Sequence, residues 1–181
     1  MRNLRFLYEF VKHPRRVGSL VPSSPFLANK MLSEIDFSLA RNVVEFGSGT
    51  GAITRHVLSK MDKQATLYCF ETNPRFVQGL RKIKDNRVRV VQDSAEKIAS
   101  YVPSADVVIS GLPLAVMPCH VNERILDGIH KVLGQQGVFV QFQYSLHSRA
   151  ELCKHFDVDL RFTLLNIPPA FVYVCRSYRA S

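Results

Sequence analysis

The segment NVVEFGSGTGAIT, from Asn42 to Thr54, decides the fold of this chain. Two valines lead into Glu45, three glycines follow at alternate positions, and the remaining residues favour a helix. This order predicts a buried strand that turns tightly into a helix. Glycine has no Cβ and tolerates positive φ. We therefore expect the turn to present backbone N–H groups and to let a small molecule approach the main chain closely.

Length and composition favour one globular domain. The chain has 181 residues, of which 46% are apolar, enough for a sizeable core. We expect a single domain over residues 1–181, with an amphipathic helix and a lid segment in 1–36 and an α/β core in 37–181. No apolar run reaches the roughly 18 residues of a membrane span, and the first residues lack the apolar block of a signal peptide. The sequence therefore predicts a cytoplasmic protein that does not cross a membrane.

Charge and cysteine content limit the possible partners. Lys and Arg number 24 against 15 Asp and Glu, so the net charge of +9 suits an anionic partner, either nucleic acid or an anionic membrane surface. The charge alone does not choose between the two. The cysteines, at 69, 119, 153 and 175, are too scattered for a metal site. No metal is expected, and we interpret them as reduced core thiols.

The N-terminal residues 1–12 place apolar side chains on one side of a helix and basic side chains on the other. This pattern predicts a short amphipathic helix that ends before Pro14. Such a helix could anchor the protein in a lipid headgroup region or pack on the domain, and the pattern leaves both open. Lys12, Arg15 and Arg16 form the basic cluster next to it, and Arg15 and Arg16 are candidates to bind a substrate phosphate.

The segment 17–26 is rich in Pro and Ser and is predicted to be a loop. Its residues Ser23 and Ser24 could cap the next helix, expected over about 25–35. The loop could equally fold over a bound cofactor as a lid. Both interpretations remain open at this point.

Strands and helices alternate through the rest of the chain and close on a hairpin. This pattern predicts an α/β domain with a doubly wound, mostly parallel sheet and an antiparallel edge strand. The expected strands after the glycine turn are 66–70, 87–91, 105–110, 137–144 and the hairpin 159–165 with 170–175. The expected helices are 53–60, 74–84 and 122–133, the last closed by Gly134.

Two acidic residues follow predicted strands. Glu71 comes directly after the strand 66–70 and lies about 20 residues beyond the glycines, the spacing at which nucleotide-binding βαβ units place a ribose ligand. Asp93 follows the next strand and precedes Ser94, and it could also cap a helix. Ligands of open α/β sheets bind beyond the carboxyl ends of the strands. We therefore expect the glycine turn, Glu71 and Asp93 to meet at one crevice.

Taken together, these motifs and the Pro-containing loop after the strand 105–110 resemble the class I S-adenosylmethionine-dependent methyltransferases. The resemblance implies a Rossmann-like fold with a seven-stranded type of sheet and S-adenosyl-L-methionine as cofactor. It implies that the glycines contact the methionine part, Glu71 the ribose and Asp93 the adenine amine. The candidate cofactor-binding residues are Glu45, Gly47, Ser48, Gly49, Gly51, Glu71, Asp93, Ser94, Ser23 and Ser24.

The acceptor loop, residues 110–114 with the sequence SGLPL, bears on the substrate. Amino-methyltransferases that act on adenine carry Asn-(Ile/Leu)-Pro-(Tyr/Phe) here, where the Asn receives the target amine and the aromatic ring stacks on a flipped base. This chain has Gly111 and Leu114 at those two positions. The lost stacking is worth about 1–3 kcal/mol, which counts against a base as substrate.

The basic arm, the loop 18–24, the acceptor loop and the segments 141–144 and 166–170 instead resemble bacterial phospholipid N-methyltransferases. The resemblance implies methylation of phosphatidylethanolamine and its methylated derivatives by a peripheral protein at the inner face of the cytoplasmic membrane. The partners expected are therefore a phospholipid substrate and an anionic membrane, with no stable nucleic-acid partner. The alternatives are an rRNA adenine N6-methyltransferase and a non-catalytic protein that binds S-adenosylmethionine.

The expected reaction is an in-line attack of a neutral amine on the sulfonium methyl group, for which the protein supplies alignment and a dry site. Tyr144 and the main-chain carbonyls of Ser110 and Gly111 are the catalytic candidates, although Tyr144 could also be a plain core aromatic. His120 is a weaker candidate than these. The candidate substrate-binding residues are Leu112, Pro113, Leu114, Arg15 and Arg16.

Overall fold

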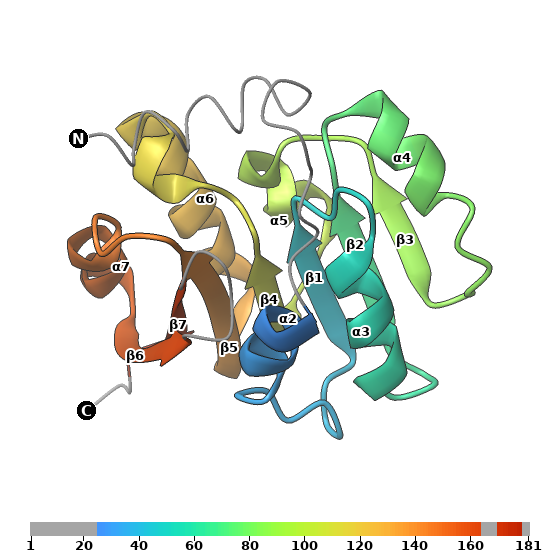
Figure 1. The fold of residues 1–181 in the computed structure, drawn as a ribbon, viewed down its shortest axis with the longest axis horizontal. Helices are drawn as coiled ribbons and strands as arrows, with labels where there is room; N and C mark the ends of the chain where they lie inside the picture. The colour runs from blue at the N-terminus through green and yellow to red at the C-terminus, as the bar shows by residue number, and fades with distance from the viewer. Residues whose placement is uncertain (1–24, 164–169, 179–181) are drawn as a thin grey trace.

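A computed structural model describes residues 25–163 and 170–178 of the chain (Figure 1). The predicted N-terminal helix lies outside these ranges, as do Arg15, Arg16, Ser23 and Ser24. The predicted turn of the C-terminal hairpin lies outside them as well. Those expectations therefore remain predictions.

The described residues form one seven-stranded sheet with the order β3-β2-β1-β4-β5-β7-β6. The strands from β1 to β5 are parallel, and β7 pairs antiparallel with both β5 and β6. The predicted mixed sheet is confirmed, with the antiparallel strand β7 lying one position inside the edge strand β6. The strands are β1 (Asn42–Phe46), β2 (Thr66–Phe70), β3 (Val88–Val91), β4 (Ala105–Ser110), β5 (Leu133–Gln143), β6 (Asp157–Thr163) and β7 (Ala170–Arg176).

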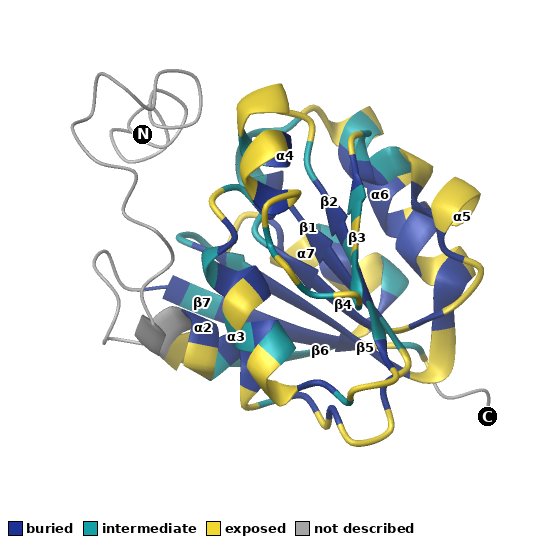
Figure 2. Cartoon of the chain, turned by 90° about the vertical axis from the view of Figure 1, so that its right-hand side faces the viewer, coloured by how far each residue is buried: buried dark blue, intermediate teal, exposed yellow. Residues whose placement is uncertain are grey.

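Helices cover both faces of this sheet, as the doubly wound prediction requires (Figures 1 and 2). Residues of α2, α3 and α4 pack in one core cluster, and residues of α5, α6 and α7 pack in the other. The helices are α2 (Pro25–Leu32), α3 (Ala52–Lys60), α4 (Pro74–Leu80), α5 (Ile98–Tyr101), α6 (Cys119–Val132) and α7 (Arg149–His155), with short 3-10 turns η1 (Ala95–Lys97) and η2 (Leu114–Val116). None of the helices in the described ranges is long and apolar enough to span a membrane.

The strand β1 is buried on both faces because it lies in the middle of the sheet. Val43 packs in one core cluster and its neighbour Val44 in the other, and both are fully buried. Successive side chains of a strand point to opposite faces, so a strand covered on both sides needs a continuous apolar run. This explains why the apolar run leading to the glycines predicts a central strand.

Several predicted boundaries are wrong by a few residues. The strand β5 begins at Leu133 instead of residue 137, β6 begins at Asp157 instead of residue 159, and α2 ends at Leu32 instead of about residue 35. The helix α4 ends at Leu80 instead of residue 84, because Gly79 is a weak helix former and the amide of Lys82 turns back to its carbonyl oxygen. The helix α6 begins at Cys119 instead of residue 122, because the carbonyl of Pro118 already accepts the first helical hydrogen bonds. Gly134 does not close α6, since β5 starts directly at Leu133.

The interpretation of the cysteines as core thiols is correct for two of the four. Cys69 and Cys175 are buried within strands. Cys119 and Cys153 are exposed, because each lies on the solvent side of a helix whose apolar residues face the sheet.

Candidate cofactor and acceptor site

The glycine turn has the backbone conformation that its sequence predicts. Gly47, Gly49 and Gly51 have φ angles of 70°, 51° and 77°. No non-glycine residue in the described ranges has a positive φ angle. The left-handed region is unfavourable for residues that carry a Cβ. The three glycines are therefore required by the path of the chain from β1 into α3.

The sequence predicts free amides in this turn, but the amides of its three glycines all donate hydrogen bonds within the protein. The N–H of Gly47 donates to the carbonyl of Phe70 at 2.9 Å, and that of Gly51 donates to Ser48 at 2.8 Å. The N–H of Gly49 donates to the carboxylate of Glu71 at 2.9 Å. These amides are used to hold the turn against the end of β2. Of the three glycines, Gly49 leaves the main chain open to a ligand, because the nearest atom to a Cβ placed there is the carbonyl oxygen of Gly47 at 3.8 Å. Side chains of the protein lie against the other two glycines.

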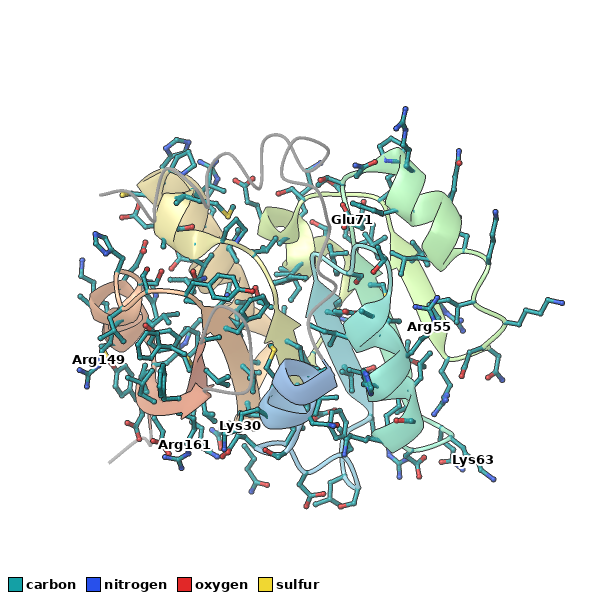
Figure 3. All side chains as sticks on the ribbon, viewed as in Figure 1. Lys30, Arg55, Lys63, Glu71, Arg149 and Arg161 are labelled. Carbon is teal, nitrogen blue, oxygen red and sulfur yellow. The ribbon has the colours of Figure 1, made fainter. Side chains whose placement is uncertain are left out.

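Glu71 lies at the carboxyl end of β2, beside the glycine turn (Figure 3). One carboxylate oxygen accepts the Gly49 amide, and the other accepts the amide of Asn73 at 2.8 Å. Its side chain is half-buried. The structure thus brings Glu71 to the turn, as the spacing predicts, and two amides fix its orientation.

Asp93 lies after β3 and is surrounded by hydrogen-bond donors. Its carboxylate accepts from the hydroxyl of Tyr101 at 2.8 Å, from the amide of Ser94 at 2.8 Å and from Lys97 at 3.1 Å. These contacts, the Tyr101 hydrogen bond foremost, hold the pKa of Asp93 below its usual value. The helix cap at this place is Ser94, whose hydroxyl accepts the amide of Glu96. Tyr101 is a site residue that the sequence did not suggest.

Glu45 and Ser48 lie beneath the turn. Glu45 is 2% exposed and accepts a hydrogen bond from the hydroxyl of Thr54 at 2.6 Å, so it ties β1 to the first turn of α3. Burial raises the pKa of Glu45 to about 7, since an ionised carboxylate is poorly solvated there. Ser48 is buried as well, with its hydroxyl 3.5 Å from the carbonyl of Glu45.

The acceptor loop packs directly on the glycine turn. A Cβ added to Gly47 would come within 3.2 Å of the side chain of Leu112. The amide of Gly111 donates to the carbonyl of Phe46 at 3.1 Å, and the buried hydroxyl of Ser110 accepts the amide of Leu112 at 3.2 Å. The loop after β4 and the turn after β1 therefore form two walls of one site.

Two glutamines of β5 also reach the acceptor loop. The side-chain amides of Gln141 and Gln143 both donate to the carbonyl oxygen of Leu112, each at 2.9 Å. Both side chains are buried. The sequence pointed to this segment only through the resemblance described above, and it did not suggest what the two glutamines contact.

The remaining predicted residues differ in how far they are buried. Tyr144 follows β5, is half-buried and meets Phe142 edge-to-face at 5.7 Å. Leu114 is 2% exposed and packs in the core under the loop, whereas Leu112 is half-buried. His120 is exposed on the first turn of α6.

The family model described as "Methyltransferase domain" matches residues 43–137 of the chain. This range begins in β1 and contains the glycine turn, Glu71, Asp93 and the acceptor loop. The match therefore covers every part of the site that the described residues form before β5.

The chain is 31% identical to an ornithine lipid N-methyltransferase from Singulisphaera acidiphila, over 97% of this chain and 96% of that protein. Among solved structures it resembles a precorrin-6y C5,15-methyltransferase from Geobacter metallireducens GS-15, with a TM-score of 0.73 and 16% identity over 88% of this chain and 92% of that one. It also resembles DhpI in its complex with SAH, with a TM-score of 0.69 and 15% identity over 94% and 93% of the two chains. The two structural similarities concern the fold.

Proposed function

We propose that this chain, which belongs to the class I S-adenosylmethionine-dependent methyltransferases, methylates the amine of a membrane lipid. The observation that carries the proposal is the 31% identity to a lipid N-methyltransferase, which extends over nearly the whole of both chains. Because the similarity covers 97% of the chain, it includes the acceptor loop and β5 as well as the cofactor side.

The cofactor of the chain is S-adenosyl-L-methionine. The site suits it, because no side chain lies within 4 Å of the Cβ position of Gly49, so that a ligand can approach the main chain of the turn there. We assign the ribose hydroxyls to Glu71 and the adenine amine to Asp93, whose lowered pKa keeps it ionised and able to accept. When bound, the cofactor supplies a methyl group on a positively charged sulfur.

The acceptor loop supports an aliphatic amine over a nucleic-acid base. Gly111 has no side chain to receive an adenine amine, and Leu114 points into the core with 2% exposure. At these two loop positions, a flipped base would find neither a stacking ring nor an amide side chain. An alkylamine needs neither of these groups.

The amine must lose its proton before it can attack, since an alkylamine resembling Lys has a pKa of about 10.4 in water. The half-buried side chain of Leu112 makes the acceptor side apolar, which disfavours the charged ammonium form. We assign the orientation of the neutral amine to the hydroxyl of Tyr144 and to the main-chain carbonyls of Ser110 and Gly111. Alignment of the reactants and the exclusion of water then account for most of the acceleration of methyl transfer.

Two lipids offer the same primary alkylamine. One is phosphatidylethanolamine, whose methylated derivatives carry the same nitrogen as a secondary or tertiary amine. The other is an ornithine lipid, the substrate named for the relative from Singulisphaera acidiphila. They differ in that the first carries a phosphate group. Arg15 and Arg16 are our candidates to bind that phosphate. A comparison of the activity toward the two lipids therefore also tests this assignment.

We further propose that the protein works at an anionic membrane surface on the cytoplasmic side. The segment 75–89 carries six basic residues against one acidic residue. Among the described residues, Arg75, Arg81, Lys82 and Lys84 are exposed and form no salt bridge. We call these four residues, of which Arg75 lies on α4 and the others in the segment that follows it, the α4 basic surface. It adds to the basic N-terminal arm as a means of electrostatic attachment.

The test is incubation of the purified chain with methyl-labelled S-adenosylmethionine and one acceptor at a time. The acceptors are vesicles containing phosphatidylethanolamine, vesicles containing an ornithine lipid, and unmodified ribosomal RNA. Label in either lipid supports the proposal and identifies the headgroup. Label in the RNA alone would replace the proposal by an adenine methyltransferase, and no label in any acceptor, together with measurable cofactor binding, would indicate a non-catalytic protein.

A further inference from the structure

Three buried side-chain amides converge on the acceptor loop. Gln141 and Gln143 of β5 donate to the carbonyl of Leu112, and Asn122 of α6 donates to the carbonyl of Leu114 at 2.8 Å. Each of the three amide side chains is at most 2% exposed. Two carbonyls of one short loop are therefore held from two different elements of the fold.

The contacts determine which way the Gln141 amide points. Its nitrogen lies 2.9 Å from the carbonyl oxygen of Leu112 and 2.7 Å from that of Phe142. Because both neighbours are acceptors, the nitrogen and not the oxygen must face them. The oxygen of Gln141 then has no hydrogen-bond partner among the described residues, and neither has the oxygen of Asn122.

This arrangement is unfavourable for stability alone. A buried polar atom without a partner destabilises the fold, whereas an apolar side chain of similar size at the same place does not. The chain nevertheless has amides at both positions, with their nitrogens on the loop. Buried polar groups that are retained at such a penalty are expected at functional sites.

We propose that Gln141, Gln143 and Asn122 are positioning residues that fix the acceptor loop against the cofactor turn for methyl transfer. The loop is the element that would meet the acceptor amine, so this inference rests on the proposed function. Leu112 connects the two sides, because its carbonyl is held by the glutamines while its side chain packs over Gly47. A shift of the loop would change the distance between amine and methyl donor without removing the cofactor site.

The double donation also decides which groups can receive the amine. A carbonyl oxygen has two lone pairs. That of Leu112 already accepts the side-chain amides of Gln141 and Gln143 and the backbone amide of Leu114, the last at 2.9 Å. It is therefore saturated and does not accept a hydrogen bond from the substrate. The main-chain carbonyls of Ser110 and Gly111 stay the proposed acceptors in this loop.

The test uses Gln141→Met, Gln143→Met and the double variant in the full-length chain. Methionine keeps the length of the side chain but lacks the donor. Each single variant should lower kcat for lipid methylation about three- to tenfold, the range expected for one hydrogen bond. The double variant should lose more than the product of the two single losses, because only then is the Leu112 carbonyl left without either glutamine.

Two further measurements and one control variant separate positioning from a general loss of structure. The Kd for S-adenosylmethionine should stay within about twofold of wild type in all variants, since the glycine turn and Glu71 are intact. Deuterium uptake should rise in a peptide covering residues 110–117 and stay unchanged in one covering 46–54. Ser148→Ala is the matched control, because the Ser148 hydroxyl is equally buried but has no hydrogen bond to lose among the described residues.

The outcomes distinguish this inference from the proposed function. If the wild type labels no lipid, the proposed function fails, and the exchange measurements still decide whether the amides hold the loop. Unchanged kcat and unchanged exchange in the double variant would overturn the inference. So would an equal weakening of cofactor binding in the double variant, which would assign the glutamines to the fold as a whole. Should the double variant not fold, the two single variants decide by the same criteria.

Discussion

Glu71 is oriented by the amides of Gly49 and Asn73, and we propose that its carboxylate binds the cofactor. Glu71→Ala should weaken binding of S-adenosylmethionine by about 1.5–3 kcal/mol, the usual value for a hydrogen bond to a charged group. Glu71→Gln should lose less, because its amide oxygen can still accept the Gly49 N–H. Isothermal titration calorimetry measures both.

Glu34→Ala serves as the control for this experiment, since Glu34 pairs with Lys30 and Arg161 away from the glycine turn. Its affinity for the cofactor should equal that of the wild type. An unchanged affinity in Glu71→Ala would remove Glu71 from the cofactor site and leave it only a role in holding the turn.

Glu45 should make the stability of the protein depend on pH. Burial raises its pKa in the folded state to about 7 from the ordinary value of 4.5, so the folded chain binds this proton more tightly than the unfolded chain does. The resulting stabilisation is fully present below pH 4.5 and is lost as the pH rises through 7. By the size of the shift it is of the order of 3 kcal/mol.

The matched variant is Glu45→Gln, whose amide oxygen can still accept from Thr54 and which does not titrate. Between about pH 5 and pH 8, the free energy of unfolding of the wild type should fall relative to that of the variant. Urea unfolding of both proteins at the two pH values measures the difference. A constant difference between them would show that Glu45 does not carry the raised pKa.

Within the turn between β1 and α3, alanine should destabilise the protein more at Gly51 than at Gly49. An alanine at Gly49 or at Gly51 pays about 1–2 kcal/mol for the left-handed backbone. At Gly51 the added Cβ would also lie 3.2 Å from the side chain of the buried Leu80, whereas at Gly49 its nearest neighbour would be 3.8 Å away. Gly51→Ala should therefore unfold at a lower urea concentration than Gly49→Ala. Equal urea midpoints of the two variants would mean that α4 can move to make room for the added Cβ without a loss of stability.

Some elements can be predicted from local sequence signals alone, and others cannot. The predicted bounds of β2 and β4 agree with the structure, since a short apolar run with flanking breakers is a property of consecutive residues. The helix α7 was not predicted. Its seven residues contain one fully buried side chain, Leu152, and so show no helical periodicity that could be recognised.

For the whole molecule, membrane attachment by electrostatics predicts two effects on binding to anionic liposomes. Deletion of residues 1–12 should abolish sedimentation with the liposomes while leaving cofactor binding measurable. Binding of the intact chain should weaken with added salt. If the truncated protein sediments like the intact one, the N-terminal arm is not the anchor.

The α4 basic surface can be tested separately with Lys82→Glu combined with Lys84→Glu. Each basic residue near an anionic surface contributes about 1 kcal/mol, so loss of the pair should weaken liposome binding by at least about 2 kcal/mol. Lys131→Glu with Lys154→Glu is the control, because these exposed residues lie on α6 and α7. Equal effects of the two pairs would indicate a dependence on net charge instead of a defined surface.

The sequence by itself determined the cofactor side of this protein. A glycine that needs positive φ, an apolar run and an acid after a strand are all features of neighbouring residues, so the turn and Glu71 could be recognised before their contact was known. The place of β7 between β5 and β6 had no such signal, because strand order depends on which surfaces remain to be covered after the chain has folded.

Only the tertiary structure decided how the acceptor side is built. Gln141 and Gln143 lie 29 and 31 residues from Leu112 along the chain, and nothing in their own segment indicates that carbonyl as their target. The register of β4 against β5 sets Ser110 beside Gln141 and so brings the loop within reach of both amides. The two glutamines meet the Leu112 carbonyl only when β4 and β5 pair. The pairing of segments far apart in the sequence leaves no local pattern from which this contact could be predicted.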